Sequence, residues 1–459
     1  MKKLMMIMSA SLLLGSCGLY NKYERPDVNT KGLVRDVTSL TDTLAVSDTT
    51  SFGNLPWRSV FTDPRLQGLI ETGLKYNFDL QNAALNVKMV EAQLLSSKLA
   101  FLPSISLTPQ GTLSSWDGHT PSKIYSLPVS ASWSIDLFGN LLSQKRSAQV
   151  ALLGMKDYQL VVKTGVITGI ANMYYTLLML DKQKAIVDEM VGLTKSTWEM
   201  MKLQKELGRA RSTSVQSAEA SYYSVQAQAA DINRQIRETE NSLSLLLGQP
   251  AQTIARGKLD EQSLPAEFST GIAIQMLNNR PDVHYAEMTL AQCFYDTETA
   301  RSRFYPSITI SGSGAYTNNS GMGIVNPGKW LLSAIGSLTQ PIFARGQLVA
   351  GLKVAKAQQE QAYNNWQNAI LKAGSEVSNA LVQYNSSDEK SRLEAKQVAV
   401  LRQNVEDTKQ LYASSGSTYL EVISAQSSLL NAELSKAADD FSKMQAVVSL
   451  YTALGGGRY

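Results

Sequence analysis

Hydrophobic and polar positions along this chain follow two periods, one typical of strands and one typical of helices. The same order of these patterns occurs in each half of the chain. Four segments alternate between apolar and polar residues, which is typical of strands with one apolar and one polar face. We expect strands at about 102–114, 124–138, 306–317 and 329–343. Their polar positions are mostly Ser and Thr, which suits a barrel wall with a lipid side and a wet lumen. A half-buried soluble sheet would show the same alternation.

Apolar positions three and four residues apart predict helices on either side of these strands. Shorter helices are expected within 64–100, where a first helix opens at Pro64 and a second runs from about Asp79 to Ala100, and at about 281–303. Four longer helices are expected at about 140–207, 210–248, 346–413 and 418–454. No proline lies between Pro128 and Pro250 or after Pro341, and each of the longest helices would reach roughly 100 Å at 1.5 Å per residue. Their heptad spacing indicates coiled coils packed side by side. The stripe expected on the helix at 210–248 is Val215, Ala218, Tyr222, Val225, Ala229, Ile232, Ile236, Thr239, Leu243 and Leu246. The stripe expected on the helix at 418–454 is Ile423, Ser427, Leu430, Leu434, Ala437, Phe441, Met444, Val448 and Tyr451.

Glycines break each pair of long helices. Gly208 and Gly416 stand where the long apolar patterns stop. A glycine at this point is typical of a left-handed helix cap, because it has no Cβ to clash. We therefore predict two helical hairpins, each with a tight turn at its end.

The chain is duplicated, with a lag of about 205 residues. Leu99–Ile105 returns as Ser302–Ile308, and Leu246-Leu247-Gly248 returns as Ala453-Leu454-Gly455. We expect a first repeat at 56–250, a linker at 251–271 and a second repeat at 272–459. Four strands cannot close a membrane barrel, which needs about eight or more. If these strands span a bilayer, several chains must share one barrel.

The N-terminus predicts secretion and lipid attachment. Lys2 and Lys3 precede an apolar stretch that is too short to span a bilayer as a helix, so residues 1–16 are expected to be a signal peptide. Small residues before Cys17 resemble a lipobox, so the thiol of Cys17 is expected to be lipidated. Residues 17–55 are polar and are expected to form an extended leader from the lipid to the folded body.

Composition offers no support for an enzyme, a metal site or nucleic-acid binding. The formal net charge of +4 falls to about +2 without the signal peptide, and no basic cluster with interleaved aromatics is present. His119 and His284 have no second ligand near them in sequence, and no catalytic motif occurs. Cys293 is expected to be a lone, buried thiol. We therefore expect no cofactor, no metal and no catalytic residues.

Several motifs in this order resemble the TolC-like outer membrane factor family, specifically its lipoprotein branch that serves resistance-nodulation-division efflux systems. The motifs are Tyr23-Glu24-Arg25-Pro26, Trp57 through Leu69, Asn77-Phe78-Asp79-Leu80, Arg280-Pro281-Asp282-Val283, Phe304 through Ile308, Gln340 through Phe343, Tyr419 through Ile423 and Ala425-Gln426. The resemblance covers nearly the whole mature chain. It implies a mixed α and β membrane protein, with four strands per chain in a 12-stranded trimeric β-barrel on a periplasmic barrel of long helices.

The resemblance also implies where the functional residues lie. Glu421 and Ser424 match the positions at which the family often carries two acidic residues at the periplasmic aperture, so this chain has one carboxylate there. Ser214 stands where the family often has an Asp. Contacts with a periplasmic adaptor protein are expected at the helical turns, at Gly208, Arg209, Ala210, Gly416, Ser417 and Thr418.

These features favour a passive outer membrane conduit of a tripartite efflux pump that exports small molecules such as drugs. Its expected partners are two further copies of the chain, a periplasmic adaptor, an inner-membrane transporter reached through the adaptor, and outer membrane lipid. Two alternatives remain open: a conduit for type I protein secretion, and a periplasmic coiled-coil scaffold without a pore. Lipidation favours small-molecule efflux over protein secretion, and the four alternating segments disfavour a scaffold.

Overall fold

The chain folds into two compact units. The structure, a computed structural model, describes residues 21–28, 33, 52–115, 117–118, 121–262, 280–319, 325–414 and 418–458. The first unit contains residues 85–157 and 284–368 with the leader residues 21–28. The second contains residues 33, 52–84, 158–283 and 369–458, within those limits. The expected signal peptide, Cys17, His119 and most of the leader lie outside the described residues, as does much of the linker.

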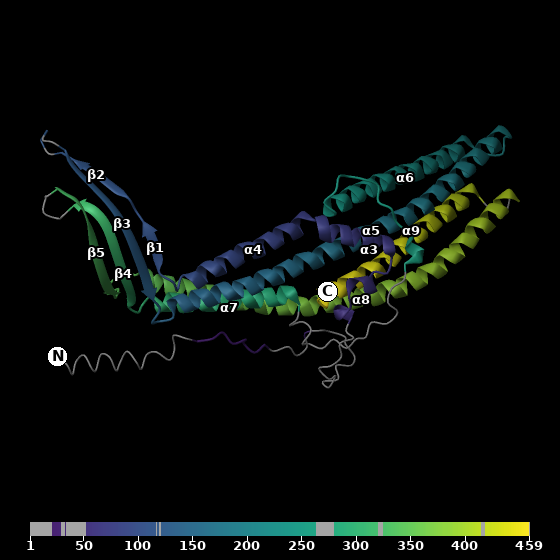
Figure 1. The fold of residues 1–459 in the computed structure, drawn as a ribbon. Coiled ribbons are helices and arrows are strands. Elements are labelled where there is room, and N and C mark those ends of the chain that lie inside the picture. The colour runs from purple at the N-terminus through teal and green to yellow at the C-terminus, as the bar shows by residue number, and fades with distance from the viewer. Residues whose placement is uncertain are drawn as a thin grey trace. The chain divides into compact units, whose positions relative to one another are not determined.

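A single antiparallel sheet forms the β part of the first unit (Figure 1). Its strands are β1 (Ser104–Leu107), β2 (Gln110–Ser114), β3 (Ser122–Ile135), β4 (Ser307–Asn319) and β5 (Val325–Thr339). β1 and β2 both pair with β3, followed by β4 and β5, so the sheet has four strand positions.

The structure divides the strand expected at 102–114 into β1 and β2. Thr108 and Pro109 separate them, and a proline nitrogen has no hydrogen to donate to a neighbouring strand. The N–H of Thr108 still donates to the carbonyl of Pro128 on β3 at 3.2 Å, and pairing with β3 resumes at Gln110 opposite Ser126. β5 begins earlier than expected and ends at Thr339, just before Gln340-Pro341.

Helices account for most of the chain. Ahead of the strands lie α2 (Trp57–Val60), α3 (Pro64–Tyr76), α4 (Phe78–Leu99) and, in the second repeat, α7 (Pro281–Ser302). The hairpin helices are α5 (Asn140–Glu206), α6 (Ser212–Leu246), α8 (Gln347–Ala413) and α9 (Tyr419–Ala453). Short 3-10 turns occupy Phe52–Asn54 and Leu259–Glu261. The two helices expected within 64–100 are confirmed as α3 and α4, and Asn77 adopts an extended conformation between them.

The apolar stripe predicted on α6 faces the interior, whereas α9 buries more than its predicted stripe. On α6, Val215, Ala218, Val225, Ile232, Ile236 and Leu243 are all buried. On α9, Ser427 of the predicted stripe is exposed, and a second stripe is buried, formed by Val422, Ala425, Gln426 and Leu429. A helix that packs against neighbours on two sides needs a wider apolar face than a two-helix seam provides.

The two repeats end their long hairpins in the same way. Asn77, at the start of α4, donates from its side chain to the carbonyl of Leu246 at the end of α6 (2.9 Å). Arg280, at the start of α7, donates to the carbonyl of Ala453 at the end of α9 (2.9 Å). Each side chain therefore satisfies a helix-terminal carbonyl that has no partner within its own helix.

Glycine is required next to one of these contacts. Gly248 has a φ of +68°, and a Cβ atom there would lie 2.4 Å from the carbonyl oxygen of Tyr76. Only a residue without a side chain fits both the backbone conformation and the close approach. Gly455, the matching residue of the second repeat, also has a positive φ, of +78°, so the repeated Leu-Gly motif reflects the same left-handed conformation after each hairpin.

Within the described residues, none of the helices is both long enough and apolar enough to cross a membrane.

Candidate functional site

The sheet has two chemically different faces. Strand register places Ile135, Trp133, Val129 and Leu127 of β3 opposite Ile308, Ile310, Gly314 and Tyr316 of β4, and Leu338, Leu332 and Trp330 of β5 follow on the same face. The other face carries Ser134, Ser132, Ser130 and Ser126 opposite Thr309, Ser311, Ser313 and Thr317. Successive side chains of a strand point to opposite faces. The predicted alternation is therefore confirmed as one apolar face and one hydroxyl face.

Hydroxyl groups on the polar face also bond across strands. The Oγ atoms of Ser106 and Ser130 lie 2.9 Å apart, and those of Ser313 and Ser333 lie 2.7 Å apart. Leu331 and Ile335 of β5 interrupt this face, so the polar pattern is weakest on the last strand. Small hydroxyl side chains leave room beside the wall and keep it wettable.

Both outer edges of the sheet lack a partner strand within the described residues. The order runs from β1 and β2 through β3 and β4 to β5, and β5 does not pair back to β1 or β2. Unpaired backbone N–H and C=O groups are costly in lipid, where no water is available to them. These edges therefore require strands from other chains if the sheet spans a membrane.

The end of the first hairpin is a compact glycine-capped turn. Gly208 has a φ of +69°, as the sequence predicts for a left-handed cap. The N–H groups of Arg209 and Ala210 both donate to the carbonyl of Gln204, at 2.8 and 3.2 Å. These bonds satisfy the last carbonyls of α5, so the turn residues expected to contact an adaptor are held by the backbone. The matching residues Gly416 and Ser417 lie outside the described residues.

Glu421 and Ser424 are both exposed near the start of α9, one helical turn apart. The carboxylate of Glu421 accepts the backbone N–H of Thr418 at 3.4 Å, as in a capping box. Glu421 forms no ion pair with the part of the chain that the structure describes. The side chain therefore has a local structural task, and it remains accessible for the predicted role at an aperture.

A cluster of apolar and aromatic side chains joins the two hairpins near their ends. Buried Met201, Val215 and Ala218 of the first hairpin pack with Trp198 and with Tyr412, Tyr419 and Ile423 of the second. Trp198 also stacks on Tyr222, and the ammonium of Lys202 lies 3.5 Å from the centre of the Trp198 ring. The periodic patterns did not predict this cluster, although Trp198, Tyr412 and Tyr419 all lie within three helical turns of Gly208 or Gly416.

One buried hydrogen bond also links the hairpins. The side-chain amide of Gln426 donates to the hydroxyl of Thr197 at 3.1 Å, and Gln426 is only 1% exposed. The resemblance singled out Ala425-Gln426 as a motif without giving it a task. The contact shows that Gln426 connects α9 to α5.

Leader residues bind along one face of the first unit. Arg25 forms an ion pair with Glu287 on α7, through two hydrogen bonds of which one measures 2.7 Å. The backbone N–H of Tyr23 donates to the hydroxyl of Tyr295 at 3.3 Å, and the ring of Tyr23 packs edge-on against Phe294. The Tyr-Glu-Arg-Pro motif thus fixes the leader to α7.

His284 pairs with the carboxylate of Asp157. Its Nδ1 lies 2.6 Å from a carboxylate oxygen of Asp157. The hydrogen bond to Asp157 raises the pKa of His284 above its ordinary value, against the opposing effect of burial. Among the described residues, no group of three His, Cys, Asp or Glu side chains could hold a metal ion.

A sheet with one lipid-compatible face and open edges, carried on long paired helices, defines a membrane conduit of the TolC-like class. Comparison with known proteins agrees: the model of the family described as outer membrane efflux protein matches residues 69–249 and 273–456. The chain belongs to this family. It is an outer membrane efflux channel protein with the mixed α and β fold of that family.

Individual relatives match over almost their whole length. The cation efflux system protein CusC of Escherichia coli K12 is 27% identical over 97% of this chain and 98% of its own. A Salmonella typhimurium protein named "Probable outer membrane lipoprotein SilC" is 25% identical over 99% and 98%. The open-state MtrE outer membrane channel of Neisseria gonorrhoeae superposes with a TM-score of 0.79 at 25% identity, over 95% of this chain and 98% of its own.

Proposed function

We propose that three copies of this chain form the outer membrane conduit of a tripartite efflux pump. The observation that carries the proposal is the registered sheet, with its apolar face, its hydroxyl face and its two open edges. Four strand positions per chain give 12 strands in a trimer, within the range in which membrane barrels close. In that arrangement β5 of one copy pairs with β1 and β2 of the next, and the hydroxyl face lines the lumen.

Lipid attachment at Cys17 would anchor each copy in the outer membrane. The leader supports this, because Arg25 and Tyr23 fix it against α7. The relative SilC carries the word lipoprotein in its name. An acylated N-terminus adds to the anchoring that the barrel provides.

The hairpin ends are the proposed docking site for a periplasmic adaptor, through which the inner-membrane transporter is engaged. The backbone bonds at Gly208, Arg209 and Ala210 give a partner a rigid turn to bind, and we assign the same role to Gly416, Ser417 and Thr418. Glu421 and Ser424 are proposed to line the aperture. In a trimer, three Glu421 carboxylates would attract cations and repel one another, so packing of α9 must hold a closed aperture together.

The inner-membrane transporter determines which compounds are exported, because the hydroxyl groups that line the proposed lumen do not select one compound. CusC is named for cation efflux, and small molecules such as drugs fit the same passive route. The conduit performs no reaction of its own. Protein secretion through a type I system is the second candidate, because a wide conduit would also admit an unfolded chain.

Reconstitution tests the proposal. The protein, purified in detergent with its leader, is expected to have about three times the mass of one mature chain. It is expected to form discrete conducting channels in planar bilayers. A stable monomer with full strand content, or a trimer that never conducts, would contradict the shared barrel.

A further inference from the structure

Basic side chains gather where the helices of the first unit meet the sheet. Lys98 lies one residue before the end of α4, and Arg301 lies one residue before the end of α7. Lys145 and Arg146 lie five and six residues into α5. At 1.5 Å per residue, all four are within about 9 Å of the helix ends that join the strands.

Three further basic residues occupy the same level, so the complete set, here called the boundary collar, is Lys98, Lys145, Arg146, Arg301, Arg303, Arg345 and Lys353. The acidic residues at this level are Asp136, Asp296 and Glu298. All three are already engaged: Glu298 pairs with Arg301 at 2.6 Å, Asp136 accepts the N–H of Leu142 at 2.8 Å, and Asp296 accepts the hydroxyl of Ser147 at 2.8 Å. The seven basic residues outnumber these three carboxylates. The collar therefore carries a net positive charge.

Part of the collar lies on the face that binds the leader. Arg146 donates to the carbonyl of Asn21 at 3.2 Å, so its side chain is on that face. Arg301 follows Phe294, the ring that contacts Tyr23, by two helical turns, which places both on one side of α7. A leader that comes from a lipid anchor must run outside the conduit. The face that binds the leader therefore lies on the outer surface of the proposed conduit, where lipid can reach it.

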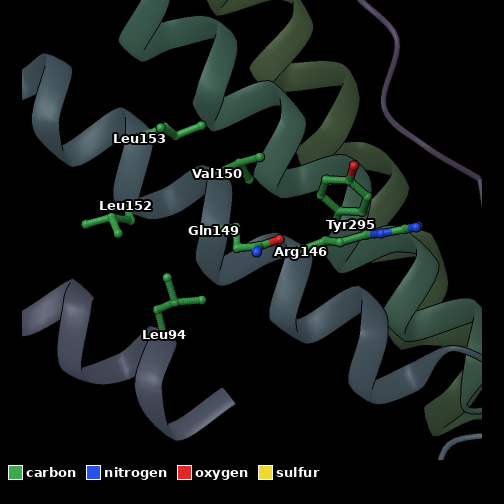
Figure 2. Close-up of a pocket in the computed structure, with 7 residues that line it drawn as sticks. All are labelled: Leu94, Arg146, Gln149, Val150, Leu152, Leu153 and Tyr295. Atoms are coloured by element: carbon green, nitrogen blue, oxygen red, sulfur yellow. The ribbon is translucent and has the colours of Figure 1, made fainter. Parts of the chain in front are cut away.

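Lys98 belongs to the same face. It follows Leu94 by one turn, and Leu94 lines a groove together with Arg146 and Tyr295 (Figure 2). The groove has a volume of about 410 Å³, and its other lining residues are Gln149, Val150, Leu152 and Leu153. Arg146 passes close to the ring of Tyr295, 5.9 Å from its centre. The boundary collar therefore lies beside this largely apolar groove, at the end of the groove that is nearer the sheet.

We propose that the boundary collar binds the phosphates of anionic phospholipids in the periplasmic leaflet of the outer membrane. The sheet's apolar face must sit in the hydrocarbon layer, and the headgroup layer next to it is about 5–8 Å deep. That depth matches the level of the collar. Arg and Lys bind phosphate oxygens through charge-assisted hydrogen bonds. Phe304 and Trp133, partly exposed at the same level, supply the aromatic residues that usually accompany a membrane interface.

Local details support a surface that is kept basic. Arg345 adopts a φ of +50°, a conformation that residues other than glycine seldom adopt, in the turn that precedes α8. The first repeat passes from strand to helix without such an extra basic residue, through Leu137-Phe138-Gly139. Lys98, Arg303, Arg345 and Lys353 form no ion pair within the described part of the chain.

The inference rests on the outer membrane placement of the sheet, and it is tested on the full-length trimer in a neutral detergent. Native mass spectrometry measures the binding of phosphatidylglycerol and of phosphatidylcholine. One basic side chain near an anionic lipid surface contributes about a fivefold gain in affinity. We therefore expect wild type to bind phosphatidylglycerol at least about tenfold more tightly than phosphatidylcholine. The double variant Lys98→Gln/Lys145→Gln should weaken phosphatidylglycerol binding by roughly 10- to 25-fold.

A matched control is available on the same two helices. Lys88 and Lys156 are exposed and lie ten and eleven residues farther from the sheet, about 15 Å deeper in the periplasm. Lys88→Gln/Lys156→Gln removes the same charge and should leave the lipid preference unchanged. A second pair, Arg303→Gln/Arg345→Gln, repeats the test if the first does not fold.

The outcomes separate the collar from the conduit. Equal binding of both lipids by wild type, or an equal loss in the control pair, would overturn the collar. Insertion into phosphatidylcholine vesicles with and without phosphatidylglycerol is measured in the same series. Failure to insert into either kind of vesicle contradicts the proposed conduit, whereas insertion into both without lipid preference contradicts the collar alone.

Discussion

Arg280 is expected to hold the second repeat together more strongly than its counterpart Asn77 holds the first. Its side chain is 5% exposed and donates to both oxygens of Asp282, at 3.0 and 2.7 Å. It also donates to Glu376 at 2.7 Å and to the carbonyl of Ala453 at 2.9 Å. Arg280→Ala removes all of these bonds and leaves a buried helix carbonyl without a donor.

The loss of folding stability in Arg280→Ala can be estimated from these contacts. Breaking a buried ion pair costs about 3–5 kcal/mol when one partner is removed. Asp282 and Glu376 are 42% and 37% exposed, so water compensates part of the loss. We expect a cost of about 3 kcal/mol, which is roughly a hundredfold increase in the unfolding rate if the contacts break before the transition state. Asn77→Ala loses one carbonyl contact and one helix cap, about 2 kcal/mol.

Isothermal unfolding of the trimer in guanidinium, followed by circular dichroism, measures both variants. Arg280→Lys is the matched control, because it keeps the charge but loses the planar pair of donors. The unfolding rate of Arg280→Lys should lie between those of wild type and Arg280→Ala. An Arg280→Ala protein that unfolds no faster than Asn77→Ala would refute the reasoning.

The pH dependence of this difference gives an independent check. Burial alone would raise the pKa of Asp282, but the hydrogen bonds and charge of Arg280 outweigh it and hold the pKa below its ordinary value of 3.8. A carboxylate with a lowered pKa stabilises the fold fully above that ordinary value and loses its contribution as the pH falls through the folded-state pKa. The difference in stability between wild type and Arg280→Ala should therefore become smaller below about pH 4.

Three further outcomes are expected. Glu421→Ala should change single-channel conductance, cation preference and divalent block in planar bilayers; unchanged values would remove Glu421 from the aperture. Cys17→Ser should abolish incorporation of labelled fatty acid, and recovery of wild type in the soluble periplasmic fraction would contradict the anchor. Because Asp157 raises the pKa of His284, their pair stabilises the fold below the ordinary value of 6.5 and is lost as the pH rises through the raised pKa. A His284→Gln variant should thus lose most stability relative to wild type at or below about pH 6 and little at alkaline pH, measured by thermal unfolding.

Periodic features of the sequence were sufficient for the elements and for the faces of the sheet. Alternation over 124–138 placed Trp133 and Ile135 on one face, because a strand's side-chain period of two leaves no other choice. The helical bounds also lie close to those of the structure, since Gly208 and the proline-free runs mark where long helices can begin and end.

Contacts between distant residues were not predictable from one sequence. Asn77 and Leu246 are 169 positions apart, and Gln426 and Thr197 are 229 apart. Nothing local distinguishes these side chains from solvated ones, because their partners are chosen by the packing of whole hairpins. The second buried stripe of α9 was missed for the same reason: it depends on how many neighbours the helix has. The predicted lipidation, aperture and adaptor residues remain predictions.

The open edges of the sheet have a genetic consequence. In the proposed assembly each copy supplies one edge to each neighbour, so no copy can complete the wall alone. A chain whose β5 edge is damaged, by a proline at a pairing position for example, would still offer an intact β1 and β2 edge to a healthy neighbour. Mixed assemblies would then contain a broken seam although most of their subunits are sound. Such alleles should be dominant over the wild type, whereas alleles that prevent folding altogether should be recessive.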